Sequence, residues 1–232
     1  MMGATAQERT KGEQAKASVP RSSAPAPNAS TRAYLALSNM IKDRVLKGGQ
    51  SIVEQRLADE LGVSRTPLRE ALQRLEGEGL VHKRANQPYV VRQVDLADYL
   101  QSMNVRKILE AEAAALAAGH VPIDKLEAAR QAVLALETTE PYDVHAHWAS
   151  DEQVHRLFID ACGNPIMMRI LHELRTTTRL FEVTRLADRL GPDSREHLAI
   201  LYAIQTGDAS AARKAMAAHA QSLTDFAIRF VR

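Results

Sequence analysis

Apolar side chains recur at helical spacing in two short segments, 55–61 and 65–76, separated by a corner at Gly62. In each segment they stand three or four positions apart, which predicts one buried face on each of two short helices. Gly62 gives the chain the backbone freedom that a tight corner needs. Ser64 stands where its side chain can accept the first free amides of the second helix. Two crossing helices joined in this way predict a helix-turn-helix.

Short β-type runs follow the second helix. Val81 and the run Tyr89–Val91 predict two strands joined by a basic loop at 83–88. Beside a recognition helix, such a hairpin is a wing that can touch the minor groove or the phosphate backbone, and the alternative is a plain solvated loop. Ahead of these elements, residues 31–45 carry a helical pattern that Gly48 ends. We expect that helix to pack behind the helix-turn-helix.

From Asp95 onward, the apolar pattern is helical almost to the end of the chain. Glycine and proline divide it into six predicted helices, and the short breaks favour antiparallel neighbours in a bundle. The sequence therefore predicts a mainly α fold, with an N-terminal winged helix-turn-helix, its small β-hairpin, and a C-terminal all-α six-helix bundle. The predicted bundle helices cover residues 95–119, 122–137, 141–162, 165–187, 193–206 and 208–230.

Residues 1–30 are rich in alanine, serine and proline and have almost no large apolar side chains. Such a segment cannot bury enough surface to offset the entropy of ordering, so we expect a disordered tail. The predicted organisation is this tail at 1–30, a winged helix-turn-helix domain at 31–94, and a helical domain at 95–232.

Composition restricts the class of protein. The chain has 232 residues and a single cysteine, Cys162, which rules out an internal disulfide framework and suits a reducing cytosol. No apolar run approaches the roughly 20 residues of a membrane span, and the N-terminus lacks the apolar core of a signal peptide. We therefore expect a cytoplasmic protein without a membrane segment. Basic side chains exceed acidic ones in 31–95 and acidic ones prevail in 96–232, as suits a chain that binds DNA with one end.

The polar face of the second short helix carries the candidate chemistry for DNA. In a helix-turn-helix, the first residues of the second helix meet base edges in the major groove. Arginine offers two parallel donors to guanine and a charge to phosphate. The alternative is a solvated face in which Glu70 and Glu76 pair with the arginines. The candidate DNA-binding residues, wing included, are Ser64, Arg65, Thr66, Arg69, Arg74, Lys83 and Arg84.

Three predicted bundle helices place histidines on their apolar faces. Asp151 and His155, four residues apart, share one face of the third helix, while His197 lies on the fifth and His219 on the sixth. A carboxylate and imidazoles on apolar stripes must be paired or coordinated, because burying them bare is costly. Neutral imidazole and carboxylate suit Zn²⁺, Ni²⁺ or Mn²⁺. The alternative is hydrogen-bonded core histidines. His147 also lies four residues from Asp151, but we place it on a more solvated side.

Arg106 and Glu110 stand four residues apart on the first bundle helix. They can form an intrahelical salt bridge worth a few tenths of a kcal/mol. Alternatively, Arg106 points into a cavity and binds the carboxylate of an anionic ligand with its planar fork.

A metal-dependent enzyme is the rival class, because an Asp/His₃ site with an open position can activate water. Such an enzyme needs a general base. Glu152 and Glu196 neighbour candidate ligands in sequence, but adjacent helical residues point elsewhere. We therefore predict no catalytic residues and a protein that is not an enzyme.

The run LADELGVSRTPLREALQRLEGEGLV closely resembles the winged helix-turn-helix of the GntR family of bacterial transcription regulators. The C-terminal part resembles the FCD ligand-binding domain of the FadR subfamily, and six bundle helices are more similar to its VanR-like branch. The matching features of the C-terminal part are VRKILEAEAA, the D-x3-H of Asp151 and His155, the pair Gly163-Asn164, the pair Glu196-His197, and His219.

This resemblance implies a homodimeric transcription regulator whose N-terminal domains bind near-palindromic double-stranded operator DNA. We expect it to act as a repressor. It also implies that the helical domain dimerises and binds a small carboxylate effector, an organic or sugar acid, which releases the DNA. Many such domains hold a divalent metal ion through one aspartate and three histidines, which fall here on Asp151, His155, His197 and His219. Zn²⁺ is the expected ion, with Ni²⁺ or Mn²⁺ as alternatives. The arginine used against the effector falls on Arg106.

Overall fold

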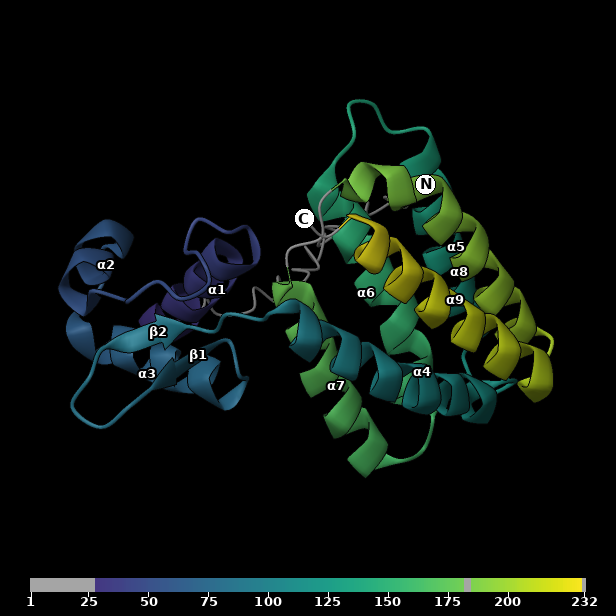
Figure 1. The fold of residues 1–232 in the computed structure, drawn as a ribbon, viewed down its shortest axis with the longest axis horizontal. Helices are drawn as coiled ribbons and strands as arrows, with labels where there is room; N and C mark the ends of the chain where they lie inside the picture. The colour runs from purple at the N-terminus through teal and green to yellow at the C-terminus, as the bar shows by residue number, and fades with distance from the viewer. Residues whose placement is uncertain (1–27, 182–184, 231–232) are drawn as a thin grey trace, which may run out of the picture.

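A computed structural model of the protein describes residues 28–181 and 185–230. Figure 1 shows a smaller N-terminal part, coloured purple to blue, beside a larger helical part coloured teal to yellow. The two parts have separate hydrophobic cores. Within the described ranges, none of the helices combines the length and the apolar character that crossing a bilayer requires.

The mainly α architecture predicted from the sequence is confirmed, with a winged helix-turn-helix followed by six bundle helices. The N-terminal elements are α1 (Ala29–Lys42), α2 (Glu54–Leu61), α3 (Arg65–Gly77), β1 (Val81–Lys83) and β2 (Tyr89–Val91). The C-terminal elements are α4 (Leu96–Ala117), α5 (Ile123–Glu137), α6 (Val144–Ala161), α7 (Pro165–Leu180), the short 3-10 helix η1 (Leu186–Arg189), α8 (Leu190–Gln205) and α9 (Ala209–Phe230).

Leucines build the N-terminal core. Leu37 of α1 and Leu68, Leu72 and Leu75 of α3 are fully buried, and burial of each such side chain contributes roughly 1.5–3 kcal/mol. Gly62 ends α2 in the left-handed region at φ 61°, which a residue with a side chain rarely adopts. The antiparallel β1–β2 pair adds Val81, Tyr89 and Val91 to this core. The predicted corner and hairpin therefore form as expected.

Two local predictions for this part are wrong. Ser64 occupies the N-cap position of α3, but its side chain accepts no hydrogen bond from the helix. The first helix was expected to continue past Val45, whereas α1 ends at Lys42 and Val45 is 63% exposed. The chain turns at Arg44, where φ is 59°, before the glycines are reached.

The N-terminal tail prediction for residues 1–30 falls mostly on residues 1–27, which lie outside the described residues. Within the described part, Asn28 caps α1 by accepting a hydrogen bond from the Thr31 amide at 2.8 Å. The first helix therefore begins at Ala29, inside the range expected to be tail.

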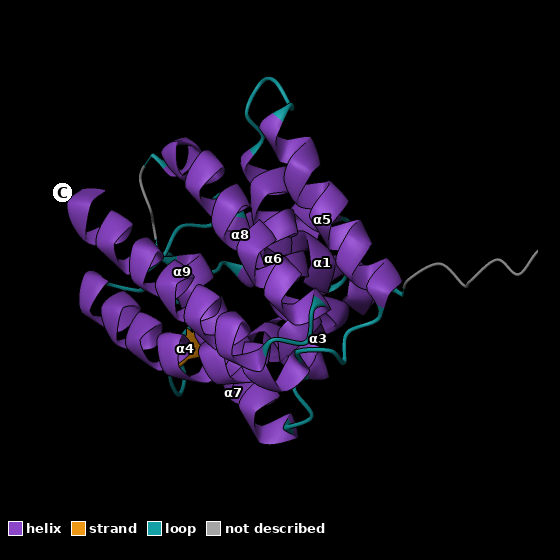
Figure 2. Ribbon diagram, turned by 90° about the vertical axis from the view of Figure 1, so that its right-hand side faces the viewer, coloured by secondary structure: helices purple, strands orange, loops and turns teal. Residues whose placement is uncertain are grey.

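The bundle is organised around α4, which packs against α6, α7 and α9 (Figures 1 and 2). Its buried face is rich in alanine, with Ala113, Ala114 and Ala117 fully enclosed. Such small side chains allow close approach of neighbouring helices. Asp95 caps α4 as predicted, accepting a hydrogen bond from the Asp98 amide at 2.8 Å.

Three helix boundaries in the bundle differ from the prediction. The third bundle helix, α6, begins at Val144, where the side chain of Asp143 caps it. Pro141 therefore lies before the helix and not in its first turn. The fourth, α7, ends at Leu180 rather than near 187. The fifth, α8, begins at Leu190, so Gly191 and Pro192 lie within its first turn, where proline is tolerated.

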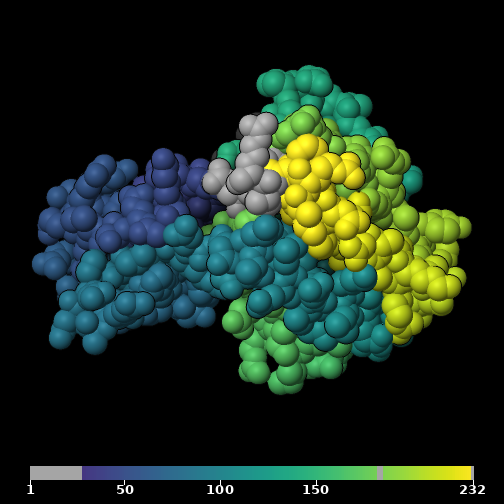
Figure 3. All heavy atoms as spheres, in the orientation of Figure 1, coloured from purple at the N-terminus to yellow at the C-terminus, as the bar shows by residue number. Residues whose placement is uncertain are grey.

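The two parts touch where the C-terminal end of α1 meets α6 and α7. The Arg44 guanidinium donates a hydrogen bond to the Phe181 carbonyl at 3.0 Å. Asp43 lies 3.2 Å from His145, measured between Oδ1 and Nδ1. Leu180 at the end of α7 packs against the N-terminal core. Figure 3 shows the two parts as neighbouring lobes in a space-filling view.

Candidate metal centre and the cavity beside it

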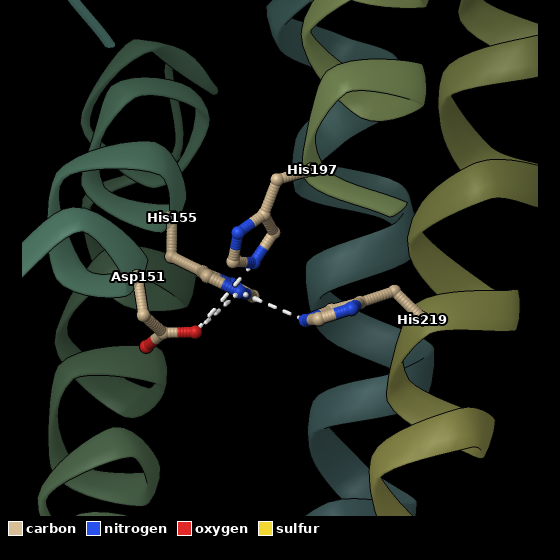
Figure 4. A group of neighbouring side chains, drawn as sticks. All are labelled: Asp151, His155, His197 and His219. Atoms are coloured by element: carbon tan, nitrogen blue, oxygen red, sulfur yellow. Dashed lines mark hydrogen bonds and ion pairs between the residues drawn. The ribbon is translucent and has the colours of Figure 1, made fainter. Parts of the chain in front are cut away.

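Asp151, His155, His197 and His219 converge from three helices (Figure 4). Asp151 and His155 project from α6, His197 from α8 and His219 from α9. Each offers one ligand-type atom, and these atoms all lie within 4.8 Å of one another. The sequence placed these four residues on three apolar stripes, and the structure brings the stripes together. Their role as metal ligands stays a prediction.

The distances fit a divalent ion with little rearrangement. The Nε2 atoms of His155 and His219 are 3.3 Å apart, and Asp151 Oδ1 lies 3.5 Å from His155 Nε2 and 3.6 Å from His197 Nε2. Ligands bonded to an ion at about 2.0–2.1 Å stand about 3.0–3.4 Å apart. His197 Nε2 is buried and has no hydrogen-bond partner among the described residues. A buried polar atom of this kind demands an explanation, and coordination supplies one.

The protonation states also suit coordination, which requires neutral imidazole and ionised carboxylate. Burial, followed by the charge of Arg175, lowers the pKa of His155. Burial, followed by the nearby His219, holds the pKa of His197 well below its ordinary value. Burial alone would raise the pKa of Asp151, but Arg175 and the histidines hold it well below the ordinary value of an aspartate.

Glu110 of α4 supports this cluster from behind, a role that the sequence did not reveal. Its side chain is completely buried, and its Oε2 lies 2.9 Å from His155 Nδ1. Arg106 binds the same carboxylate through two nitrogens, at 2.8 and 3.2 Å. Burial alone would raise the pKa of Glu110, yet Arg106 and His155 hold it well below its ordinary value. Arg106 and Glu110 therefore form a buried salt bridge, and not the weak surface salt bridge that their spacing alone suggests.

His219 has a similar support. Its Nδ1 lies 2.7 Å from Glu196 Oε2, which leaves Nε2 directed at the cluster. Glu196 was expected to have no contact with the ligand cluster because it neighbours His197 on the same helix, and its contact with His219 shows that this expectation is wrong. A carboxylate on the second nitrogen of a ligating histidine fixes the tautomer and the ring orientation. Glu196 therefore suits a positioning role better than that of a general base.

Asp193, Glu196 and His219 form a second group with metal-ligand chemistry. Arg189 already occupies it, because its guanidinium hydrogen-bonds to Asp193 and lies 2.7 Å from Glu196. The positive charge that these carboxylates require is thus supplied by the protein itself.

The prediction that His147 lies on a solvated side is wrong. His147 is only 4% exposed. Its Nδ1 lies 2.9 Å from the Tyr142 hydroxyl and its Nε2 lies 3.2 Å from Asp193 Oδ2. The helix turns this residue toward α8, whose Asp193 gives it a partner. His147 is therefore a hydrogen-bonded core histidine beside the metal-type cluster.

A cavity of about 490 Å³ reaches from Asp151 to the junction of the two parts. Arg106 lines it, as expected, but both ends of its guanidinium are committed to buried partners, Glu110 and Thr178. Arg175 of α7 also lines it and binds Asp151 Oδ2 at 2.8 Å. The N-terminal part contributes to the wall of the cavity through Asn39, Lys42, Asp43, Glu78 and Leu80.

The candidate DNA-binding residues lie on the N-terminal part. Arg65, Thr66 and Arg69 are exposed on the first turns of α3. Arg69 donates a 2.7 Å hydrogen bond to Glu54 of α2, and Arg65 lies 3.8 Å from the same carboxylate. Their acidic partner thus comes from the preceding helix rather than from α3.

The remaining candidates lie further along. The guanidinium of Arg74 stacks over the Tyr34 ring at 3.6 Å. Lys83 and Arg84 are exposed at the hairpin, where the Lys83 ammonium lies 4.8 Å from the centre of the Tyr89 ring. DNA contact by any of these residues stays a prediction.

Two family models match the chain. The model described as bacterial regulatory proteins, gntR family, matches residues 29–91, and the FCD domain model matches residues 101–222. The first covers the helix-turn-helix and its hairpin, and the second covers the helices that carry the Asp/His cluster.

Curated relatives agree with these matches. The probable D-xylose utilization operon transcriptional repressor of Paenarthrobacter nicotinovorans is 28% identical over 174 residues, 74% of this chain and 76% of that protein. The HTH-type transcriptional regulator LutR of Bacillus subtilis is 27% identical over 211 residues, 80% of this chain and 95% of that protein. Among solved structures, E. coli McbR/YncC superposes with a TM-score of 0.73 at 20% identity, covering 88% of this chain and 99% of that one. That likeness shows a shared fold.

Proposed function

The chain belongs to the gntR family of bacterial regulatory proteins and carries an FCD domain, and from this premise we propose that it is a repressor released by a small acid. We assign DNA binding to residues 31–94 and effector binding and dimerisation to residues 95–232. The effector, an organic or sugar acid, would bind at a metal-containing pocket in the helical domain. The repressor assignment draws support from the D-xylose operon repressor among the relatives.

One observation carries the proposal. The cavity beside the Asp/His cluster has the C-terminal end of α1 in its wall, through Lys42 and Asp43. A ligand in this cavity would therefore touch the part of the chain that presents α3 to DNA. A ligand can change DNA affinity only if it binds one arrangement of the two parts more tightly than another. Coupling of about 1–3 kcal/mol would change operator affinity roughly 5–150-fold.

The cluster residues would hold a divalent ion, and the ion would offer a Lewis-acid position to one carboxylate oxygen of the effector. Glu110 and Glu196 would orient His155 and His219 through their second nitrogens. Arg175, which lies against Asp151 and lines the cavity, would face the same end of the effector.

The general experiment is a DNA-binding assay on the zinc-loaded protein. A duplex would be selected from a random library by the protein itself, and its affinity would be measured by fluorescence anisotropy with and without a panel of organic and sugar acids. Release of the selected duplex by at least one acid supports the proposal. Failure to select any duplex, in the presence or absence of these acids, would contradict it.

Arg69→Ala is expected to weaken binding of the selected duplex about 5- to 150-fold, as the loss of a base contact worth about 1–3 kcal/mol implies. If Arg69 instead contacts phosphate, the slope of affinity against salt should fall by about one. Arg130→Ala is the matched control, because Arg130 is also half-exposed and paired with a glutamate, but lies on α5. Equal binding by both variants would remove Arg69 from the interface.

The proposed homodimer can be tested on α4. Val105, Ile108 and Leu116 are 42%, 69% and 43% exposed, and their spacing places them on one stripe of the helix. An apolar stripe of this kind suits a contact between copies. Ile108→Glu should shift the mass measured by light scattering from dimer to monomer and weaken duplex binding. Ile123→Glu, at an equally exposed position on α5, should do neither; a dimer that tolerates both changes must use another face.

The rival proposal of a metal-dependent enzyme finds no observation in its favour. Of the two carboxylates weighed as a base, Glu152 lines the cavity but is bound to Arg175 at 2.8 Å. Glu196 contacts the Nδ1 side of His219, opposite the nitrogen that faces the other ligands. The family and the curated relatives are transcription regulators.

A further inference from the structure

Arg179 lines the cavity and lies close to Arg44 and Asp43 of the N-terminal part. It projects from the last turn of α7, and its guanidinium stacks over the Trp148 ring of α6 at 4.1 Å from the ring centre. Stacking on an aromatic ring holds a guanidinium in a fixed plane while leaving its N–H groups free to donate. Arg179 is thus positioned as a rigid donor in the wall of the cavity.

The charge of Arg179 is not matched by the protein as the other arginines are. Among the residues that the structure describes, no carboxylate lies within ion-pair distance, 4.0 Å, of its guanidinium. Burial, followed by the charge of Arg44, lowers the pKa of Arg179 to about 10. Asp43, Asp151 and Glu152 favour its charged form from a greater distance, but their effect is smaller than that of burial. A partly buried cation without a carboxylate in direct contact is costly. The other arginines of the cavity have carboxylate partners: Arg106 has Glu110, Arg156 has Asp160, Arg175 has Asp151 and Glu152, and Arg189 has Asp193 and Glu196.

Two more cations from the N-terminal part stand near Arg179. Arg44 is close enough to disfavour its charge, and it is held in place by the hydrogen bond to the Phe181 carbonyl. Lys42 lines the same cavity from the end of α1. The two acids that the N-terminal part contributes to the cavity both have partners: Asp43 lies 3.2 Å from His145, and Glu78 lies 3.2 Å from Arg74. The local excess of positive charge therefore favours an anion.

Arg179 and Trp148 each lie about one helical turn from a residue at or beside the Asp/His cluster. Arg179 follows Arg175 by four residues on α7, so both occupy one face of the helix. Trp148 precedes Asp151 by three residues on α6 in the same way. Along each helix the two residues are about one turn apart, with roughly 5–6 Å between their Cβ atoms. A small molecule with acidic groups at its two ends can span that distance.

We propose that Arg179 forms a second anion subsite in the cavity, so that the effector is a small acid with two anionic groups. One group occupies the end marked by Asp151 and Arg175, and the other binds Arg179. This inference rests on the proposed function, because it specifies the effector of the same pocket. The second group is a carboxylate or a phosphate, and the subsite chemistry is shared by both.

The test is calorimetric titration of the full-length, zinc-loaded protein with two matched pairs of probes. Glutarate is compared with butyrate, and 3-phosphoglycerate with glycerate, so each pair differs by one anionic group. The wild type should bind at least one doubly charged probe about 10- to 100-fold more tightly than its partner, as one charge-assisted contact implies. The pair that shows the difference identifies carboxylate or phosphate as the second group.

Arg179→Met should abolish this difference within a pair and leave the affinity for the singly charged probe within about twofold. Arg169→Met is the matched control on the same helix, since Arg169 is exposed and lies outside the cavity lining. Arg179→Lys keeps the charge but loses the planar fork, so it should recover part of the difference. It also provides the answer if the methionine variant fails to fold.

The subsite is overturned if the wild type binds none of the four probes, if it binds the members of each pair equally, or if Arg179→Met and Arg169→Met behave alike. These results are separate from the DNA experiment. A protein that selects a duplex but shows none of the charge discrimination keeps the proposed function and loses the subsite. A protein that discriminates through Arg179 but selects no duplex keeps the subsite and loses the regulator.

Discussion

Replacing His197 with alanine is expected to remove stoichiometric metal from the purified protein and to weaken Zn²⁺ binding by more than about 100-fold, beyond the usual effect of losing an outer-shell partner. His197 Nε2 is buried, lies 3.6 Å from Asp151 Oδ1 and has no hydrogen-bond partner among the described residues. Metal analysis by mass spectrometry after dialysis measures the content. Thermal unfolding at increasing Zn²⁺ measures the affinity, because an ion that binds only the folded state stabilises it.

His147→Ala is the matched control for this experiment. His147 is buried to a similar degree and lies near the cluster, but its two nitrogens face Tyr142 and Asp193. Its loss should lower the unfolding temperature while the protein keeps its metal. The assignment of a metal centre is contradicted if both variants retain the wild-type ion content, or if gently purified wild type holds no stoichiometric ion. The histidines would then have a structural role only.

Glu110→Ala is expected to lower the free energy of unfolding by about 3–5 kcal/mol, the usual effect of removing one partner of a buried ion pair. The side chains of Arg106 and Glu110 are 5% and 0% exposed, and the substitution would leave the Arg106 charge buried without its carboxylate. Chemical denaturation should be measured on metal-free protein, because Glu110 also contacts His155 and would change metal binding as well.

Glu112→Ala is the control for that loss. Glu112 lies two residues away on the same helix and pairs with Arg213 at 2.7 Å, but both side chains are more than 40% exposed. Exposed pairs contribute about 0–1 kcal/mol, so this variant should be close to wild type. The double substitution Arg106→Met with Glu110→Leu should recover most of the stability, since it removes both charges. A similar loss in the two single variants would show that burial of the Glu110 pair has little energetic effect.

The helix-turn-helix could be predicted because its signals are local. The spacing of Leu68, Leu72 and Leu75 marks the buried face of α3, and Gly62 marks the corner at a positive φ. The candidate ligands could be named for the same reason, because each lies on an apolar stripe of its own helix. That these stripes meet depends on how α6, α8 and α9 pack, which a resemblance to a family can suggest and periodicity cannot.

The contacts that surround the candidate ligands could not be predicted, because they depend on how segments distant in the sequence pack together. Glu110 and Arg106 stand at a spacing that most often means an exposed bridge, and only the packing of α4 against its neighbours buries them. Glu196 is adjacent to His197 on α8, so the two side chains point in different directions. Its carboxylate nevertheless contacts His219 of α9. The burial of His147 could not be predicted for a related reason, since its partner Asp193 is 46 residues further along the chain.

The wall of the cavity has a consequence for engineering biosensors from this protein. Lys42 and Asp43 belong to the DNA-binding part but face the same cavity as Arg179. A chimaera that joined a foreign DNA-binding domain at residue 94 would replace this strip along with the operator specificity. The response to the proposed effector would then change even though the whole bundle had been kept. Grafting only the exposed positions of α3 into the native chain would avoid that loss.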